Sequence, residues 1–171
     1  MQAWHFVGDT LRDGSPVPPD GKWLAHSGKL VLCESGLHAS PDPFDALQYA
    51  PGPILCLVEL GGKIVKDADK YVASRRKILR RMDATELLRY FARMQALSVI
   101  HLWDPPDVVL DYLMTGDESI WDAARDAAWD ARDAARAAAR DAAWAAAWDA
   151  AIQKNRDLFA SLVDAEFQEY L

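Results

Sequence analysis

The densest group of side chains that could do chemistry is a basic run in the middle of the chain. Between Lys66 and Arg93, nine lysines and arginines stand against four acids. Five of the basic residues lie close together: Arg75, Arg76, Lys77, Arg80 and Arg81. A solvated strand and helix face would account for this charge. A local site for phosphate groups or an acidic partner would account for it equally, and the sequence leaves both interpretations open.

Histidines and cysteines form no complete catalytic or metal-binding pattern. The four histidines are far apart in the sequence: His5, His26, His38 and His101. There is no nucleophile elbow and no Walker phosphate loop. Cys33 and Cys56 both fall in apolar runs, which predicts buried free thiols, with a disulfide as the alternative. We expect no metal site, because no closely spaced set of Cys and His is present.

Three short motifs follow one another in the first half of the chain. Trp4-His5 lies in a predicted strand, residues 36–40 (GLHAS) precede a short helix that ends at Tyr49, and residues 53–61 (PILCLVELG) form a later strand. Their order, and the thirteen residues from Gly36 to Tyr49, resemble the poly-ADP-ribose-polymerase-like branch of the ADP-ribosyltransferases. The resemblance covers residues 3–75. It implies that fold, with NAD or an ADP-ribose-like molecule as the ligand.

The same resemblance implies roles for individual residues. In that family a histidine holds the ribose of the nicotinamide nucleotide and a tyrosine stacks on the nicotinamide ring, so these roles fall to His5 and Tyr49. The ligand pocket implied for this chain is bounded by six residues: His5, Gly36, His38, Ser40, Tyr49 and Lys70.

The chain departs from that family at the catalytic acid. The family's glutamate begins a later strand, and here Lys70 occupies the corresponding position, between Asp69 and Tyr71. A lysine cannot accept a hydrogen bond from a ribose hydroxyl, and it suits a phosphate or carboxylate instead. We therefore expect a non-catalytic, ligand-binding derivative. An active NAD-dependent transferase with Asp69 or Glu59 as a displaced acid is the alternative.

A second resemblance covers nearly the whole chain. It rests on residues 32–40 (LCESGLHAS), 45–49 (DALQY), 58–61 (VELG), 69–70 (DK) and 115–119 (TGDES), followed by an alanine-rich repeat. These motifs resemble an uncharacterised family common in phages and prophages. The resemblance implies a phage-encoded accessory protein in the host cytosol that acts on a host defence protein or enzyme.

The chain is predicted to be α+β, with a small mixed head at residues 1–82 and an all-helical region at residues 83–171. In the head we expect strands at residues 3–7, 29–33, 54–60 and 71–79. Gly61-Gly62 is expected to be a turn. Ser40-Pro41 is expected to begin the short helix, because serine caps helix N-termini and proline suits the first helical position.

The helical region should contain a long helix at about residues 117–154. Tryptophan and arginine recur along it at steps of three or four residues, so they form one slowly winding stripe. The stripe predicts either packing within the chain or contact with a partner, a second copy of the chain included. The candidate partner-binding residues are Trp121, Trp129, Trp144, Trp148, Arg136 and Arg140.

The overall charge and hydropathy limit the classes of function that the protein can have. A net charge of −7 argues against general nucleic-acid binding. Because the sequence shows no membrane-spanning stretch and no secretory signal pattern, we expect a cytoplasmic protein. The preferred hypothesis is a non-catalytic protein that binds a nucleotide-like or phosphate-bearing ligand, a host protein, or both. A purely protein-binding inhibitor of a host enzyme is a further alternative.

Overall fold

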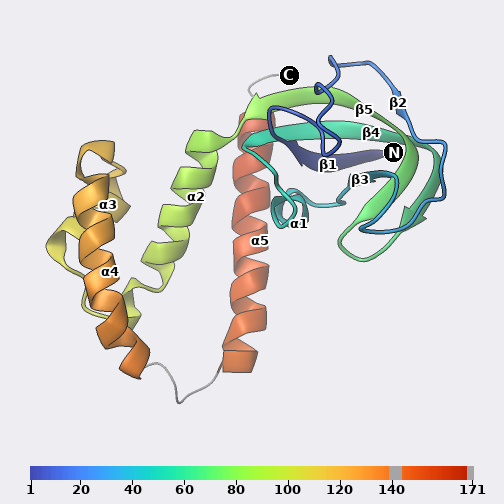
Figure 1. Ribbon diagram of the computed structural model, residues 1–171. Coiled ribbons are helices and arrows are strands. Elements are labelled where there is room, and N and C mark those ends of the chain that lie inside the picture. The colour runs from blue at the N-terminus through green and yellow to red at the C-terminus, as the bar shows by residue number, and fades with distance from the viewer. Residues whose placement is uncertain (139–143, 169–171) are drawn as a thin grey trace. The chain divides into compact units, whose positions relative to one another are not determined.

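The computed structural model of the protein (Figure 1) describes residues 1–138 and 144–168, and the side chains of these residues except 130, 132–138, 144–150 and 168. The fold is α+β, which confirms the fold class predicted from the sequence. The described strands are β1 (Gln2–Val7), β2 (Leu24–Ala25), β3 (Leu37–Ala39), β4 (Ile54–Lys66) and β5 (Tyr71–Asp83). The described helices are α1 (Pro43–Leu47), α2 (Thr85–Ser98), α3 (Asp107–Thr115), α4 (Trp121–Ala138) and α5 (Trp144–Gln168), with the 3-10 turns η1 (Ile100–Leu102) and η2 (Glu118–Ile120).

The chain divides into two compact units. One unit joins residues 1–86 to the part of α5 from Arg156 onward, and the other comprises Leu87–Asn155. The C-terminal part of α5 belongs with the sheet because Phe159 and Val163 are fully buried there. Arg156 adds an ion pair, with its guanidinium 2.6 Å from Asp45 of α1. The C-terminal end of the predicted helical region thus packs with the head.

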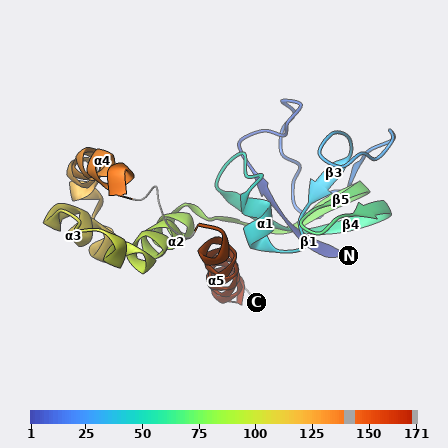
Figure 2. The same cartoon turned by 90° about the horizontal axis from the view of Figure 1, so that it is seen from below.

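The sheet curls until β1 meets the segment that follows β3. The strand order is β1-β4-β5-β2, all neighbours are antiparallel, and β3 also pairs with β5. Directly after β3, the backbone of Ser40 exchanges two hydrogen bonds of 2.8 Å with Trp4 of β1. The chain therefore closes a ring from β1 through β4, β5 and β3 back to β1, and Figure 2 shows α1 against this curled sheet. Closure satisfies the backbone of edge strands and encloses a core.

Gly61 and Gly62 lie inside β4, so the predicted turn at this point was wrong. The pairing of β4 with β5 shifts between Gly61 and Ile64, which makes the segment a β-bulge. Gly62 has a φ of 70°, a conformation that glycine adopts without strain. The bulge bends the two 13-residue strands and so helps the sheet to curl. The actual turn between the strands is at residues 67–70, where the amide of Asp67 donates to the carbonyl of Lys70.

Two further local predictions were wrong. Residues 29–33 form no strand, because the chain turns back there: Val31 pairs with Ser35, and Cys33 has a φ of 65°. The short helix begins at Pro43 with Asp42 as its N-cap, whose carboxylate accepts from the amide of Phe44 at 2.8 Å. Ser40-Pro41 and Asp42-Pro43 offer the same capping chemistry, and the backbone of Ser40 is already used by Trp4.

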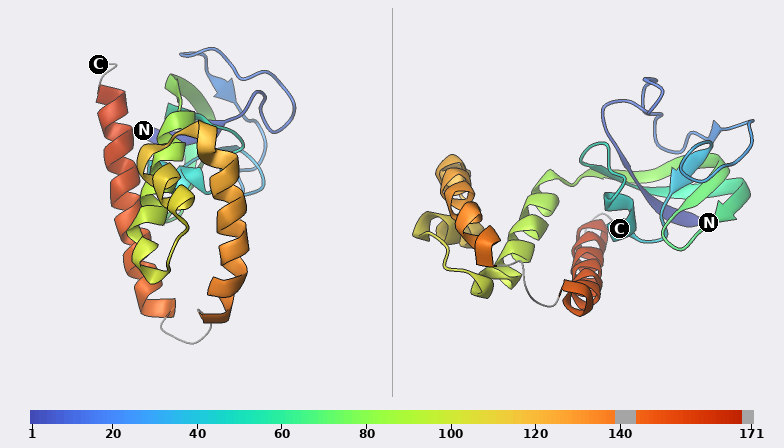
Figure 3. Two further views of the ribbon diagram at one scale, coloured as in Figure 1. Left: turned by 90° about the vertical axis from the view of Figure 1, so that its left-hand side faces the viewer. Right: turned by 60° about the horizontal axis from the view of Figure 1, so that its bottom comes forward.

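All the secondary structure described in the second unit is helical. Figure 3 shows α3 and α4 side by side, and Gly116 ends α3 in the left-handed conformation. The predicted long helix corresponds to α4, preceded by η2, and to α5, which continues to Gln168; residues 139–143 lie outside the described residues. Among the helices that are described, each is too short or too polar to cross a lipid bilayer.

Candidate functional site

A cavity of about 1160 Å³ opens on the head. Its walls come from β1, β2, β3, Arg76 in the middle of β5, the loop after β1, and the end of α1. Residues far apart in sequence meet here because the sheet closes on itself. The six residues predicted to bound a ligand pocket all line this one cavity: His5, Gly36, His38, Ser40, Tyr49 and Lys70. Whether they bind a ligand stays a prediction.

Arg76 of β5 is the most unusual residue in the cavity wall. Its side chain is only 6% exposed, and its guanidinium donates a hydrogen bond to the backbone carbonyl of His38. In the part of the chain that the structure describes, no carboxylate forms an ion pair with Arg76. Burial lowers the pKa of Arg76 to about 10. A buried cation without a counter-ion is costly, so the cavity is suited to an anion.

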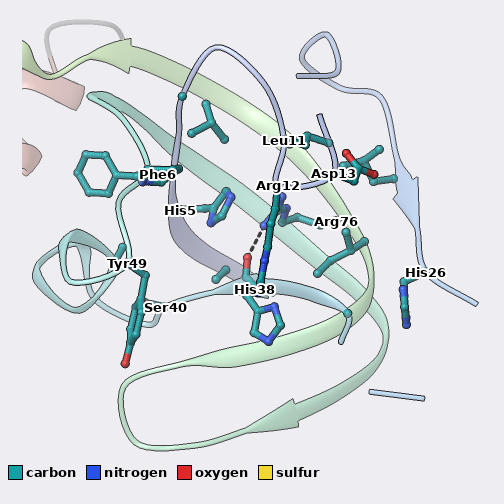
Figure 4. A pocket seen from close by; sticks show the side chains of 18 of the residues that line it. His5, Phe6, Leu11, Arg12, Asp13, His26, His38, Ser40, Tyr49 and Arg76 are labelled. Atoms are coloured by element: carbon teal, nitrogen blue, oxygen red, sulfur yellow. Dashed lines mark hydrogen bonds between the residues drawn. The ribbon is translucent and has the colours of Figure 1, made fainter. Parts of the chain in front are cut away.

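His5 lies beside this guanidinium. It stands on β1 opposite Cys56 of β4, and Figure 4 shows its ring on the same side as the Arg76 side chain, whereas the ring of His38 points away from both. The pKa of His5 is well below its ordinary value, first because of burial and then because of the positive charge of Arg76 and the neighbouring His38. His5 is therefore a neutral imidazole at pH 7, with one nitrogen that donates a hydrogen bond and one that accepts.

His38 has a structural task in addition to its place in the cavity. Its Nε2 atom accepts a hydrogen bond of 3.0 Å from the backbone amide of Cys33, so this nitrogen carries no proton. The bond holds the turn at residues 31–35 against β3. Burial lowers the pKa of His38, and the charges of Arg76 and Arg12 act in the same direction.

Tyr49, Asp69 and Lys70 form a hydrogen-bonded group at the mouth of the cavity. The hydroxyl of Tyr49 donates to Asp69 at 2.6 Å and accepts from Nζ of Lys70 at 3.2 Å. The ammonium of Lys70 also lies 5.2 Å from the centre of the Tyr49 ring. Hydrogen bonds to the side chains of Cys33 and Tyr49 raise the pKa of Lys70, so Lys70 is a fixed positive charge at the rim.

The two acids considered for a transferase are both engaged by other side chains. Neither Asp69 nor Glu59 is among the residues that line the cavity. Asp69 accepts the Tyr49 hydroxyl, which lowers its pKa. Glu59 forms an ion pair of 2.8 Å with Lys77, and this hydrogen bond lowers the pKa of Glu59. Asp69 is thus held by Tyr49, and Glu59 by Lys77.

Gly36 and Ser40 shape the cavity through their backbones. Gly36 has a φ of 121°, and a Cβ atom there would collide with the side chain of Val72, so only glycine fits. Ser40 is 3% exposed, and its backbone is bonded to Trp4 in both directions.

Sequence reasoning missed Arg12 altogether and singled out Arg76 only as one of five basic residues. Arg12 lines the cavity from the loop after β1, and its charge acts on His38. Alternation along a strand was the available signal for Arg76, because Arg75 and Lys77 on either side must face the other way. No comparable signal marks Arg12, which lies in a loop.

The cysteines are only partly as predicted. Cys56 is a buried free thiol whose pKa burial raises to about 11, whereas Cys33 is a free thiol exposed in its turn. Among the described residues, no group of three His, Cys, Asp or Glu side chains is placed to hold a metal ion.

Of the candidate partner-binding residues, Trp121 and Trp129 can be placed. Trp129 is 64% exposed and Trp121 is 39% exposed, with the guanidinium of Arg125 over the Trp121 ring at 4.8 Å. The side chains of Trp144, Trp148 and Arg136, and all of Arg140, lie outside the described residues.

Comparison with known proteins assigns the head to a family. No curated protein and no solved structure was found to match the chain. Residues 1–90, which carry the whole cavity, match the family described as Domain of unknown function (DUF7666). This match spans more than half of the 171 residues, and the chain belongs to the DUF7666 family.

Proposed function

We propose that the cavity of the DUF7666 domain is a binding site for a small phosphate-bearing, nucleotide-like ligand, and that the domain acts by binding rather than by turnover. The observation that carries the proposal is Arg76, a buried guanidinium that faces the cavity without a carboxylate partner in the described structure. A bound phosphate would supply the missing counter-charge through charge-assisted hydrogen bonds.

The rest of the cavity supports a ligand of this class. Cavities that hold small molecules commonly measure roughly 300–1,000 Å³, so about 1160 Å³ has room for a nucleotide. The neutral imidazole of His5 can bond a hydroxyl or a phosphate oxygen next to Arg76. Lys70 adds a second positive charge at the mouth. Apolar groups such as Leu11 and Leu24 offer surface to a base or sugar.

Binding without turnover is favoured by the chemistry at the mouth. Lys70 stands where the resembling transferases have a glutamate, and its ammonium donates to the Tyr49 hydroxyl. A positive charge there repels the oxocarbenium-like centre that such a glutamate stabilises.

Thermal unfolding with a panel of AMP, ADP-ribose, NAD and cyclic dinucleotides tests the proposal. A ligand at 100 times its Kd should stabilise the protein by about 2.7 kcal/mol, and the melting temperature should rise accordingly. Arg76→Met should abolish the shift, because the central anion partner is gone. Arg75→Gln is the matched control, since this neighbouring arginine does not line the cavity. If no compound of the panel stabilises the wild-type protein, the proposal fails.

A further inference from the structure

Two arginines approach the same point of the cavity from different elements. Arg76 comes from β5 and Arg12 from the loop between β1 and β2, and both charges act on the imidazole of His38. Figure 4 shows Arg12 reaching in among His5, His38 and Arg76. Arg76 is nearly buried, whereas Arg12 is exposed in its loop. One guanidinium therefore forms the floor, and the other can close on a ligand from outside.

The acids near this point do not neutralise the pair. Three carboxylates also line the cavity, those of Asp9, Asp13 and Glu34, and all three residues are exposed. Asp13 already accepts two hydrogen bonds from Ser15, at 3.0 Å from its amide and 2.6 Å from its hydroxyl. In the part of the chain that the structure describes, no acid forms an ion pair with Arg12 or Arg76.

Two guanidinium forks fit one kind of anionic group better than another. A terminal phosphate monoester has three free oxygens and a charge of about −1.5 to −2 at pH 7. A phosphate inside a diester or a pyrophosphate bridge has only two free oxygens and a single charge. Each guanidinium can bind two oxygens side by side. Two of them in one place match the monoester in charge and in number of acceptors.

We infer that Arg12 and Arg76 together select a ligand that ends in a phosphate monoester, in preference to a phosphodiester or a bridging pyrophosphate. The inference rests on the proposed anion-binding function and narrows its ligand class. Arg76 supplies the buried half of the site. Arg12 supplies the discrimination between the ester types, because it binds best to a phosphate that still offers free oxygens and charge once Arg76 has bound it.

A pair of small probes tests this inference independently of the base or sugar. Methyl phosphate and dimethyl phosphate differ by one methyl group and one charge, and NMR shifts of the His5 and His38 imidazoles report binding of either at pH 7.5. We expect methyl phosphate to bind the wild-type protein at least about tenfold more tightly. Arg12→Gln should weaken methyl phosphate to the level of dimethyl phosphate and leave the dimethyl ester nearly unchanged. Arg12 is exposed, so this variant should fold.

The matched control is Arg75→Gln, which removes an arginine that does not line the cavity and should keep the full discrimination. Equal binding of the two probes by the wild-type protein would overturn the inference and leave the proposed anion site intact. Discrimination that survives Arg12→Gln would overturn it as well. If neither probe moves the imidazole signals, the proposed function fails, and the inference fails with it.

Discussion

The two faces of β5 place basic side chains in opposite environments. On the outer face, Arg75 and Lys77 lie over the ring of Trp23, at 4.6 Å and 4.9 Å from its centre, and Lys77 also pairs with Glu59. On the inner face, Arg76 lies between them in sequence, and in the described structure its hydrogen-bond partner is the backbone carbonyl of His38. Three consecutive basic residues thus divide into two compensated cations and one uncompensated cation.

The difference separates a structural from a functional explanation of the basic run. Cations on a solvated face need no ligand, because water, an aromatic ring and an exposed acid satisfy them. Arg76 is shielded from water and gains little from the fold itself. A lowering of its pKa to about 10 corresponds to roughly 3 kcal/mol of stability lost on burial. Stability given up at one residue in a cavity wall is typical of a binding site.

The largest effect is expected from Arg76→Met, which removes the inner cation and keeps an apolar side chain of similar length. Phosphate-probe binding should weaken by more than about 100-fold, because a charge-assisted contact is lost. The ligand-free protein should become more stable by about 1 kcal/mol, since relief of the buried charge outweighs the unpaired His38 carbonyl. Urea unfolding measures the second effect. A clear loss of stability would mean that Arg76 stabilises the fold, and the contrast between the two faces of β5 would not hold.

A smaller effect is expected on the pH dependence of stability, through His5 on the inner face. The folded pKa of His5 lies well below its unfolded value of about 6.5, so below that pH the unfolded chain binds a proton that the folded chain does not. The free energy of unfolding should therefore fall as pH falls from about 6.5 toward the folded pKa, by up to about 1.4 kcal/mol per pH unit. His5→Gln should lose less stability than the wild type between pH 7 and pH 5.

Urea unfolding at several pH values checks this prediction. His101→Gln is the control, because His101 is exposed in the second unit and should keep the wild-type dependence. If the His5→Gln and wild-type curves run parallel, the imidazole titrates as it does in the unfolded chain, and neither burial nor the charge of Arg76 lowers its pKa.

The smallest effect is expected on the outer face. Lys77→Ala removes a partly exposed ion pair with Glu59 and a contact with Trp23, which together should cost less than about 1 kcal/mol. Raising the salt concentration should reduce the difference further, because the pair is screened. Probe binding should be unchanged. A loss above 2 kcal/mol in urea unfolding would show that the outer cations support the fold as strongly as apolar core residues do.

Local patterns predicted a good part of the fold. The strands expected at residues 3–7, 54–60 and 71–79 appear as β1, β4 and β5, and the helix expected from about residue 117 appears as η2 and α4. These features depend on neighbours in sequence, through side-chain alternation and backbone preference. The α+β class follows from them, because strands precede helices along the chain.

The errors arose where two local solutions were equally good. Ser40-Pro41 and Asp42-Pro43 can both begin a helix, and the pairing of Ser40 with Trp4 of a distant strand decided between them. Two glycines can form a turn or a bulge, and the register of β4 against β5 chose the bulge at Gly61-Gly62. In each case the deciding contact lies outside the segment.

The sequence by itself determined which residues of β5 share a face, since side chains alternate along any strand. It also placed six candidate residues on the segments that come to line one cavity. Only the tertiary structure decided that the face of Arg76 is the enclosed one and that Arg12 joins it from a loop. The physical reason is that the cavity exists through closure of the sheet at Trp4 and Ser40, a contact between segments 36 residues apart whose pairing no local pattern encodes.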